Sequence, residues 1–102
     1  MIGRTVDARA VKPEAKTADP FYLTPEYRVW REAVVARASR QCEWVEHGER
    51  CTKSEPRHRM FADHVHEVRD GGDRYAVSNG MCLCGRHHTI KTARARAERM
   101  RA

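Results

Sequence analysis

The chain lacks long apolar runs, a secretion-signal pattern and internal repeats. No stretch approaches the roughly 18 apolar residues that a membrane-spanning helix needs, so we expect no membrane association. The first residues do not show the charged and then apolar pattern of a signal peptide. These absences predict a soluble protein of the cytoplasm.

Aromatic residues are also scarce, at seven of 102 residues, while a third of the chain is charged. A large continuous core is therefore not expected, and a domain this small usually needs an additional staple. We predict one domain over residues 21–102. Residues 1–20 contain Pro13 and Pro20 with little periodic hydrophobicity, which is typical of a flexible arm.

Acidic residues are nearly missing from the C-terminal stretch. Glu98 is the only acid among residues 86–101, against six basic residues, which are Arg86, Lys91, Arg94, Arg96, Arg99 and Arg101. The whole chain has a net charge of +6. A basic surface of this kind suits a polyanion such as DNA, although charge alone is equally compatible with a solvated helix face.

A first helix is expected to begin at Thr24-Pro25, because threonine caps free backbone amides and proline is tolerated at the first helical position. Apolar residues then recur at helical spacing, at Tyr27, Trp30, Val34 and Val35. The interval between Cys42 and Cys51 is predicted to be a loop or a loose hairpin.

Two short strands and a second helix are predicted to follow. Residues 60–62 lead into residues 63–68, whose alternation fits a short strand. The run Asp-Gly-Gly-Asp at 70–73 predicts a turn, and residues 81–83 fit a returning strand. A basic helix is expected from about His88, with one stripe formed by Ile90, Ala93, Ala97 and Met100. The predicted class is α+β.

Four cysteines, Cys42, Cys51, Cys82 and Cys84, favour metal binding, because the cytoplasm keeps thiols reduced. Cys84 and His87 have the two-residue ligand spacing of a zinc knuckle just before a helix. Cys42 and Cys51 then complete a tetrahedral site of three thiolates and one imidazole. The alternative is a four-cysteine site in which Cys82 replaces His87. A structural zinc would supply the missing staple.

Asp63, His64, Asn79 and His88 form a second constellation. Phosphodiester hydrolysis needs an activated water and neutralisation of the charge on the phosphorane and the leaving oxygen. A hard cation held by a carboxylate and a histidine provides the neutralisation, and an imidazole that titrates near neutral pH can accept the proton of the water. On a regular strand Asp63 and His64 point to opposite faces, which is compatible with separate roles.

These residues resemble the HNH endonuclease family. The resemblance rests on Asp63-His64-Val65, Gly71-Gly72, Asn79-Gly80 and the run from Leu83 to Thr92, Leu-Cys-Gly-Arg-His-His-Thr-Ile-Lys-Thr. The segment from Phe21 to Trp30 and the cysteines before Asp63 extend it over about residues 21–95. It implies a small zinc-stapled ββα-metal finger with an N-terminal helix and a basic C-terminal helix, of a type frequent in phages and prophages of bacterial host cells.

The resemblance also implies a role for each residue of the motif. Asp63 and His88 would bind the catalytic divalent ion, which is Mg²⁺ or another ion such as Mn²⁺ or Ni²⁺. His64 would be the general base, and Asn79 would hold the loop and orient it. Relatives usually have cysteine where His87 stands, so His87 is implied as a substituted zinc ligand.

The sequence departs from the family pattern at two positions after His64. His66 and Glu67 stand where relatives often have an apolar residue and a proline, so either could add a metal ligand or face solvent. Arg86, Lys91 and Arg94 are expected to contact DNA phosphates with little sequence readout. The implied activity is a metal-dependent endodeoxyribonuclease leaving 5′ phosphate and 3′ hydroxyl, with phage terminase or portal proteins as partners if it serves DNA packaging. The alternative is a non-catalytic zinc module that binds nucleic acid.

Overall fold

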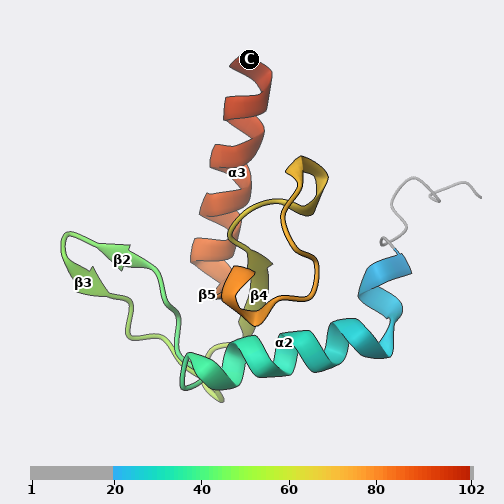
Figure 1. The fold of residues 1–102 in the computed structure, drawn as a ribbon. Helices are drawn as coiled ribbons and strands as arrows, with labels where there is room; N and C mark the ends of the chain where they lie inside the picture. Colours follow the sequence, from blue (N-terminus) through green and yellow to red (C-terminus); the bar gives the residue numbers. More distant parts are fainter. Residues whose placement is uncertain (1–19, 102) are drawn as a thin grey trace, which may run out of the picture.

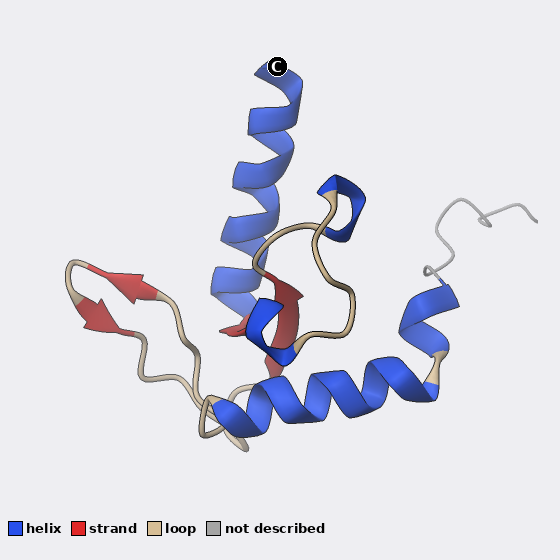
Figure 2. Ribbon diagram, viewed as in Figure 1, coloured by secondary structure: helices blue, strands red, loops and turns tan. Residues whose placement is uncertain are grey.

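The computed structural model of the chain describes residues 20–101. The elements follow in the order η2 (Pro20–Leu23), α2 (Pro25–Arg37), β2 (Val45–Glu46), β3 (Glu49–Arg50), β4 (Met60–His64), η3 (Val68–Asp70), η4 (Val77–Asn79), β5 (Gly80–Cys84) and α3 (Gly85–Arg101). Apart from Pro20, the arm predicted over residues 1–20 lies outside the described residues. The predicted α+β class is confirmed, with two small antiparallel sheets (Figures 1 and 2).

The arrangement is simple (Figure 1). Helix α2 runs crosswise to α3, the β4–β5 hairpin lies between them, and the β2–β3 hairpin extends away to one side. The buried core is formed by Trp30, Val34, Val35, Ala38, Cys42, Met60, Cys82, Leu83 and Cys84. Neither of the long helices among the described residues combines the length and the apolar character needed to cross a membrane.

Helix α2 begins where the sequence predicts. The Thr24 side chain accepts a hydrogen bond from the backbone N–H of Tyr27 at 3.2 Å, and Pro25 is the first helical residue. Trp30, Val34 and Val35 are buried, as the helical spacing predicts. This face packs against β4 and β5, so burial of a continuous apolar stripe holds the helix on the sheet.

Two arginines of α2 also tie the helix to the sheet. Arg31 donates to the carbonyl oxygen of Met60 at 2.7 Å. Arg37 donates to the carbonyl oxygens of Val77 at 2.7 Å and Gly80 at 3.0 Å. Met60 and Gly80 are the first residues of β4 and β5, and Val77 belongs to η4. The two guanidinium groups therefore bind backbone carbonyls at the start of each strand and in the turn before β5.

Gly80 allows α2 to approach the sheet closely. A Cβ at this position would overlap the Val34 side chain and would lie 3.2 Å from Cζ2 of Trp30. Any larger residue would push the helix away from β5. The glycine that follows Asn79 is therefore required by packing.

Strand β4 pairs with β5 from Met60, opposite Cys84, to His64, opposite Gly80. The strand therefore includes the lead residues 60–62 and ends at His64, and the alternation that predicts a strand as far as Val68 is wrong beyond that residue. The last cross-strand contact is the Val65 N–H to the carbonyl oxygen of Asn79 at 2.9 Å. Beyond it, the Asn79 side chain bonds both backbone groups of His66, which turns the chain away from β5.

The Cys42–Cys51 interval contains the predicted hairpin, formed by β2 and β3. Its two turn residues, His47 and Gly48, have φ values of 55° and 79°. A two-residue turn with positive φ at both positions matches the twist of the flanking strands. The turn at 70–73 is also confirmed, with Gly71 at φ 100° closing η3.

Helix α3 begins at Gly85, three residues earlier than predicted, and among its described residues only His87 is buried. The apolar stripe predicted on this helix is exposed after Ile90, because Ala93 and Ala97 are exposed and Met100 is 81% exposed. The distal part of α3 thus projects beyond the rest of the fold (Figure 1). The basic side chains of this part therefore face solvent.

Candidate metal centre and neighbouring histidine site

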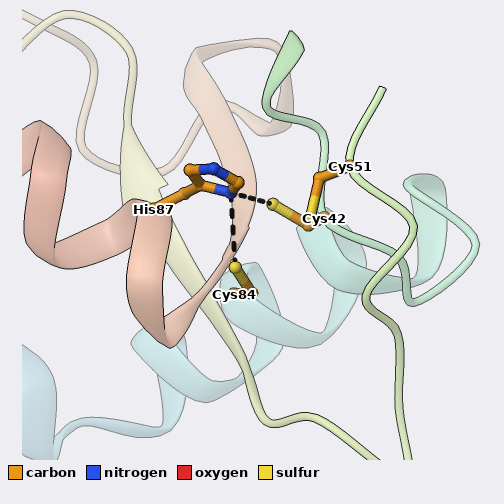
Figure 3. A group of neighbouring side chains, drawn as sticks. All are labelled: Cys42, Cys51, Cys84 and His87. Atoms are coloured by element: carbon orange, nitrogen blue, oxygen red, sulfur yellow. Dashed lines mark hydrogen bonds between the residues drawn. The ribbon is translucent and has the colours of Figure 1, made fainter. Parts of the chain in front are cut away.

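The predicted zinc ligands Cys42, Cys51, Cys84 and His87 come together at one point (Figure 3). Their ligand atoms all lie within 4.8 Å of one another. His87 Nδ1 is 3.5 Å from Cys42 Sγ and 3.4 Å from Cys84 Sγ. In a tetrahedral zinc site a sulfur and a nitrogen ligand are about 3.6 Å apart. The cluster therefore fits a metal ion such as zinc.

Each ligand comes from a different part of the fold. Cys42 follows the end of α2, and Cys51 follows β3, where its N–H donates to the carbonyl oxygen of Trp44 at 2.8 Å. Cys84 is the last residue of β5, and His87 lies in the first turn of α3. An ion held here would tie the hairpin, the sheet and both helices together, which is the staple that a short chain needs.

The Cys84 sulfur also caps α3. Burial acts to raise the pKa of Cys84, but hydrogen bonds from the backbone amides of His87 and Arg86 and from the thiols of Cys42 and Cys51 lower it below its ordinary value. The two amides belong to the first turn, whose N–H groups have no partner inside the helix. A sulfur accepting them does the work of an N-cap side chain, which explains why α3 starts directly after Cys84.

The structure distinguishes Cys82 from Cys84. Cys82 is fully buried in the core and is not part of the cluster. Burial raises the pKa of Cys82 to about 11, and the charges of Glu43 and Glu55 act in the same direction. Burial also raises the pKa of Cys42 to about 11. Of the two ligand sets predicted from the sequence, the one with Cys84 and His87 is the one brought together.

His64 occupies the opposite face of β4 from the residues that face α3. It is 5% exposed, and its ring stacks on Trp30 of α2 with centroids 4.4 Å apart and planes at 15°. His64 Nε2 lies 3.0 Å from the carbonyl oxygen of Arg74. Because a carbonyl oxygen only accepts hydrogen bonds, Nε2 must donate, and in the neutral ring Nδ1 then bears the lone pair.

Asn79 holds the loop that contains Arg74. Its Oδ1 accepts from the His66 N–H at 2.8 Å, and its Nδ2 donates to the carbonyl oxygens of His66 at 3.0 Å and Asp73 at 2.8 Å. Asp73 Oδ1 in turn accepts from the N–H groups of Tyr75 and Ala76, both at 2.9 Å. These bonds fix the chain on both sides of Arg74, so they set the direction of the carbonyl that binds His64.

Asp63 and His88 both face the interface of β4 with α3. His88 stacks on Phe61, with centroids 4.8 Å apart and planes at 2°. Phe61 and Asp63 are two residues apart on β4 and therefore lie on the same face. Asp63 and His88 thus share this side of the sheet, while His64 lies on the other side, as the strand alternation predicts.

Lys91 occupies the space beside Asp63. Its Nζ lies 3.3 Å from Asp63 Oδ2 and 3.4 Å from Glu67 Oε2, and it donates to the carbonyl oxygen of His64 at 3.0 Å. The Lys91 side chain is 19% exposed. Lys91 is predicted to contact DNA, but in the structure its ammonium group lies between two carboxylates and neutralises them.

The other two predicted DNA-contacting residues lie at the surface. Arg86 and Arg94 are both exposed on α3. The Arg94 guanidinium lies over the Trp44 ring, 5.3 Å from its centroid. His66 is exposed as well. The Glu67 carboxylate lies near the Lys91 ammonium group, which also pairs with Asp63.

Several contacts of both sites escape prediction from the sequence. Helical spacing predicts that Trp30 packs in the core, and the structure shows that its ring also packs against His64. Trp44 stacks on the zinc-ligand candidate His87, with centroids 5.1 Å apart and planes at 5°. No spacing rule relates these pairs, because each joins segments that only the folded chain brings together.

Comparison of the chain with protein-family models, with curated proteins and with solved structures finds no match.

Proposed function

We propose that the chain is a metal-dependent DNA endonuclease of the HNH type, in which His64 removes the proton from the attacking water. One observation carries the proposal. His64 is held with Nε2 as a donor to the Arg74 carbonyl, which makes Nδ1 the basic nitrogen. A general base accepts its proton at a nitrogen that bears a lone pair, and this hydrogen bond fixes which nitrogen that is.

Asn79 serves in this proposal as a positioning residue. Its three side-chain hydrogen bonds fix residues 66 and 73, and through them the Arg74 carbonyl that orients the imidazole. The Trp30 ring fixes the plane of the imidazole. The Arg74 carbonyl holds one edge of the imidazole and the Trp30 ring holds one face, so the imidazole has one orientation. Proton transfer to Nδ1 needs such a fixed orientation.

Asp63 and His88 would hold the catalytic Mg²⁺, or Mn²⁺ or Ni²⁺, at the β4–α3 interface. One carboxylate and one imidazole leave positions open for substrate, and such an ion stabilises the charge that develops on the phosphate and on the leaving oxygen. Lys91 already pairs with Asp63. Binding of a divalent ion at this carboxylate therefore requires the ammonium group to move.

The proposed substrate is DNA, bound with little sequence preference. The projecting part of α3 presents Arg94, Arg96, Arg99 and Arg101 to solvent, with Glu98 the only acid among residues 86–101. Such side chains bind phosphates by charge and release counterions, which gives affinity that falls with salt. The zinc site would hold α3, β5 and the β2–β3 hairpin together while DNA is bound.

The direct test is nicking of supercoiled plasmid by the purified protein with Mg²⁺, Mn²⁺ or Ni²⁺. The His64→Ala variant is expected to lose about 10²- to 10⁴-fold in rate, the usual contribution of a general base. His47→Asn is the matched control, because His47 is exposed at a hairpin tip and asparagine tolerates its positive φ.

Zinc content and the thermal transition of each variant show whether it is folded. A folded His64→Ala protein that nicks at the wild-type rate would remove His64 as the base. Absence of nicking by the wild type in all three metals would remove the proposed activity.

The second candidate is a zinc module that binds nucleic acid without cutting it. The Lys91 contacts favour it, because Asp63 and Glu67 already have a cation between them and need no other. Salt-dependent DNA binding with no nicking in any of the three metals would select this candidate.

A further inference from the structure

The buried edge of His87 lacks a hydrogen-bond partner. His87 is 5% exposed, and its Nε2 is the one buried side-chain polar atom without a partner in the part of the chain that the structure describes. Its other nitrogen, Nδ1, faces the sulfur atoms of Cys42 and Cys84. A neutral imidazole that binds a metal through Nδ1 carries its proton on Nε2. This buried N–H therefore needs an acceptor.

Glu46 is placed to be that acceptor. Its Oε1 lies 3.8 Å from His87 Nε2, which is about 1 Å longer than a hydrogen bond. The Glu46 side chain is 53% exposed, so solvent leaves it room to rotate. A metal on Nδ1 withdraws charge from the ring and makes Nε2–H a stronger donor, which favours closure of this gap onto a carboxylate.

The β2–β3 hairpin holds Glu46 against the metal site. Arg50 of β3 donates to the carbonyl oxygens of Cys42 at 2.9 Å and Ala38 at 2.7 Å, which anchors the base of the hairpin. Trp44, two residues before Glu46, stacks on the His87 ring. The hairpin thus contacts the imidazole on its face and on its Nε2 edge.

A histidine ligand needs this support and a cysteine ligand does not, because only histidine carries a second polar atom. We propose that Glu46 accepts the Nε2–H of metal-bound His87 and is a positioning residue of the zinc site. This role explains the length of the Cys42–Cys51 interval, because the interval contains the hairpin and the two residues, Trp44 and Glu46, that contact or approach His87. The inference rests on the zinc site included in the proposed function, and it does not depend on DNA cleavage.

The test is the zinc affinity of the full chain, measured by competition with a chromophoric chelator. Glu46→Ala is expected to raise the dissociation constant for zinc by about 10- to 100-fold, the usual effect of removing the partner of a metal-bound histidine. Glu49→Ala is the matched control. Glu49 lies opposite Glu46 in the same hairpin and carries the same charge, and its removal is expected to change the constant less than about twofold.

A double-mutant cycle gives the sharper result. In the His87→Cys background the ligand at position 87 has no second polar atom. Adding Glu46→Ala to this background is expected to change the dissociation constant for zinc by less than about twofold. An equal loss in both backgrounds, or equal effects of Glu46→Ala and Glu49→Ala, would overturn the role of Glu46 while leaving the zinc site in place. A wild-type chain that binds no zinc would overturn the zinc site and this inference together, whatever the nicking assay shows.

Histidine nitrogen NMR of the zinc-loaded protein gives an independent measurement if His87→Cys does not fold. The Nε2–H signal of His87 is expected to be visible and slow to exchange in the wild type and in Glu49→Ala. In Glu46→Ala its exchange with water is expected to be at least tenfold faster. Equal exchange in all three proteins would contradict the proposal.

Discussion

The two sites differ in how completely the folded chain assembles them. At the candidate zinc site, four ligand atoms converge within 4.8 Å, and three of the four residues are buried. At the proposed catalytic site, Asp63 already pairs with Lys91, while His88 stacks on Phe61. The first arrangement suits an ion that stays. At the second, the Lys91 ammonium group already occupies the space beside the carboxylate.

The difference follows from the chemistry of the ligands. Thiolates and an imidazole in a closed tetrahedron suit a structural zinc, whereas a single carboxylate and imidazole bind a hard cation loosely and keep positions open. His87 and His88 are neighbours on α3, but their rings stack on different partners, Trp44 and Phe61. Two adjacent residues of one helix turn therefore point into two different environments.

The largest expected effect is loss of the zinc site. Cys84→Ser removes a ligand and weakens the cap of α3, and because structural zinc binding is worth about 10 kcal/mol or more, the variant is expected to lose its cooperative thermal transition. Cys82→Ala is the matched control. It removes a buried thiol outside the cluster and is expected to cost about 1 kcal/mol while one zinc per chain is retained. Zinc analysis and thermal unfolding measure both, and zinc loss in Cys82→Ala instead would reverse the assignment of the two cysteines.

A smaller effect is expected when the loop of the catalytic site is released. Asn79→Ala removes the three side-chain hydrogen bonds that fix residues 66 and 73, so His64 loses its fixed orientation. We expect plasmid nicking to fall about 10²-fold, the cost of a misplaced catalytic group, with zinc content unchanged. Full nicking activity in a variant whose loop exchanges its amide hydrogens faster would show that Asn79 does not position the base.

The smallest effect concerns the ammonium group beside Asp63. Lys91→Met removes the cation that competes with a divalent ion, so Mn²⁺ is expected to bind the DNA-free protein about fivefold more tightly, which corresponds to about 1 kcal/mol for a largely buried ion pair. Lys53→Met is the control for the change in net charge. Titration with Mn²⁺ detected by electron paramagnetic resonance measures both variants. Unchanged or weaker binding in Lys91→Met would mean that Lys91 does not occupy the ion position.

The sequence predicts the local features of this fold well. Thr24 and Pro25 mark the start of α2, and the glycines after Asp70 mark a turn. The spacing of Cys84 and His87 identifies the half of the candidate zinc site that lies at the start of α3. Each of these signals depends on residues close together in the chain. The sequence favours Cys84 with His87 over a site that includes Cys82. Spacing alone does not show which sulfur meets Cys42, because both cysteines lie on one strand.

Contacts between distant segments account for what the sequence does not predict. The strand predicted to reach Val68 ends at His64 because the Asn79 side chain replaces β5 as the partner of the backbone at His66. Helix α3 begins at Gly85 because the Cys84 sulfur accepts its first amides. The charge of Lys91 predicts a DNA contact, and only the folded chain places its ammonium group beside Asp63.

The central claim is that His87 and His88 belong to two different metal sites. Zinc content and plasmid nicking, measured on the same preparations of His87→Ala and His88→Ala, test it most directly. We predict that His87→Ala loses its zinc, and that His88→Ala keeps one zinc per chain and a normal thermal transition but no longer nicks DNA. Loss of zinc in His88→Ala, or unchanged nicking by that variant, would contradict the account.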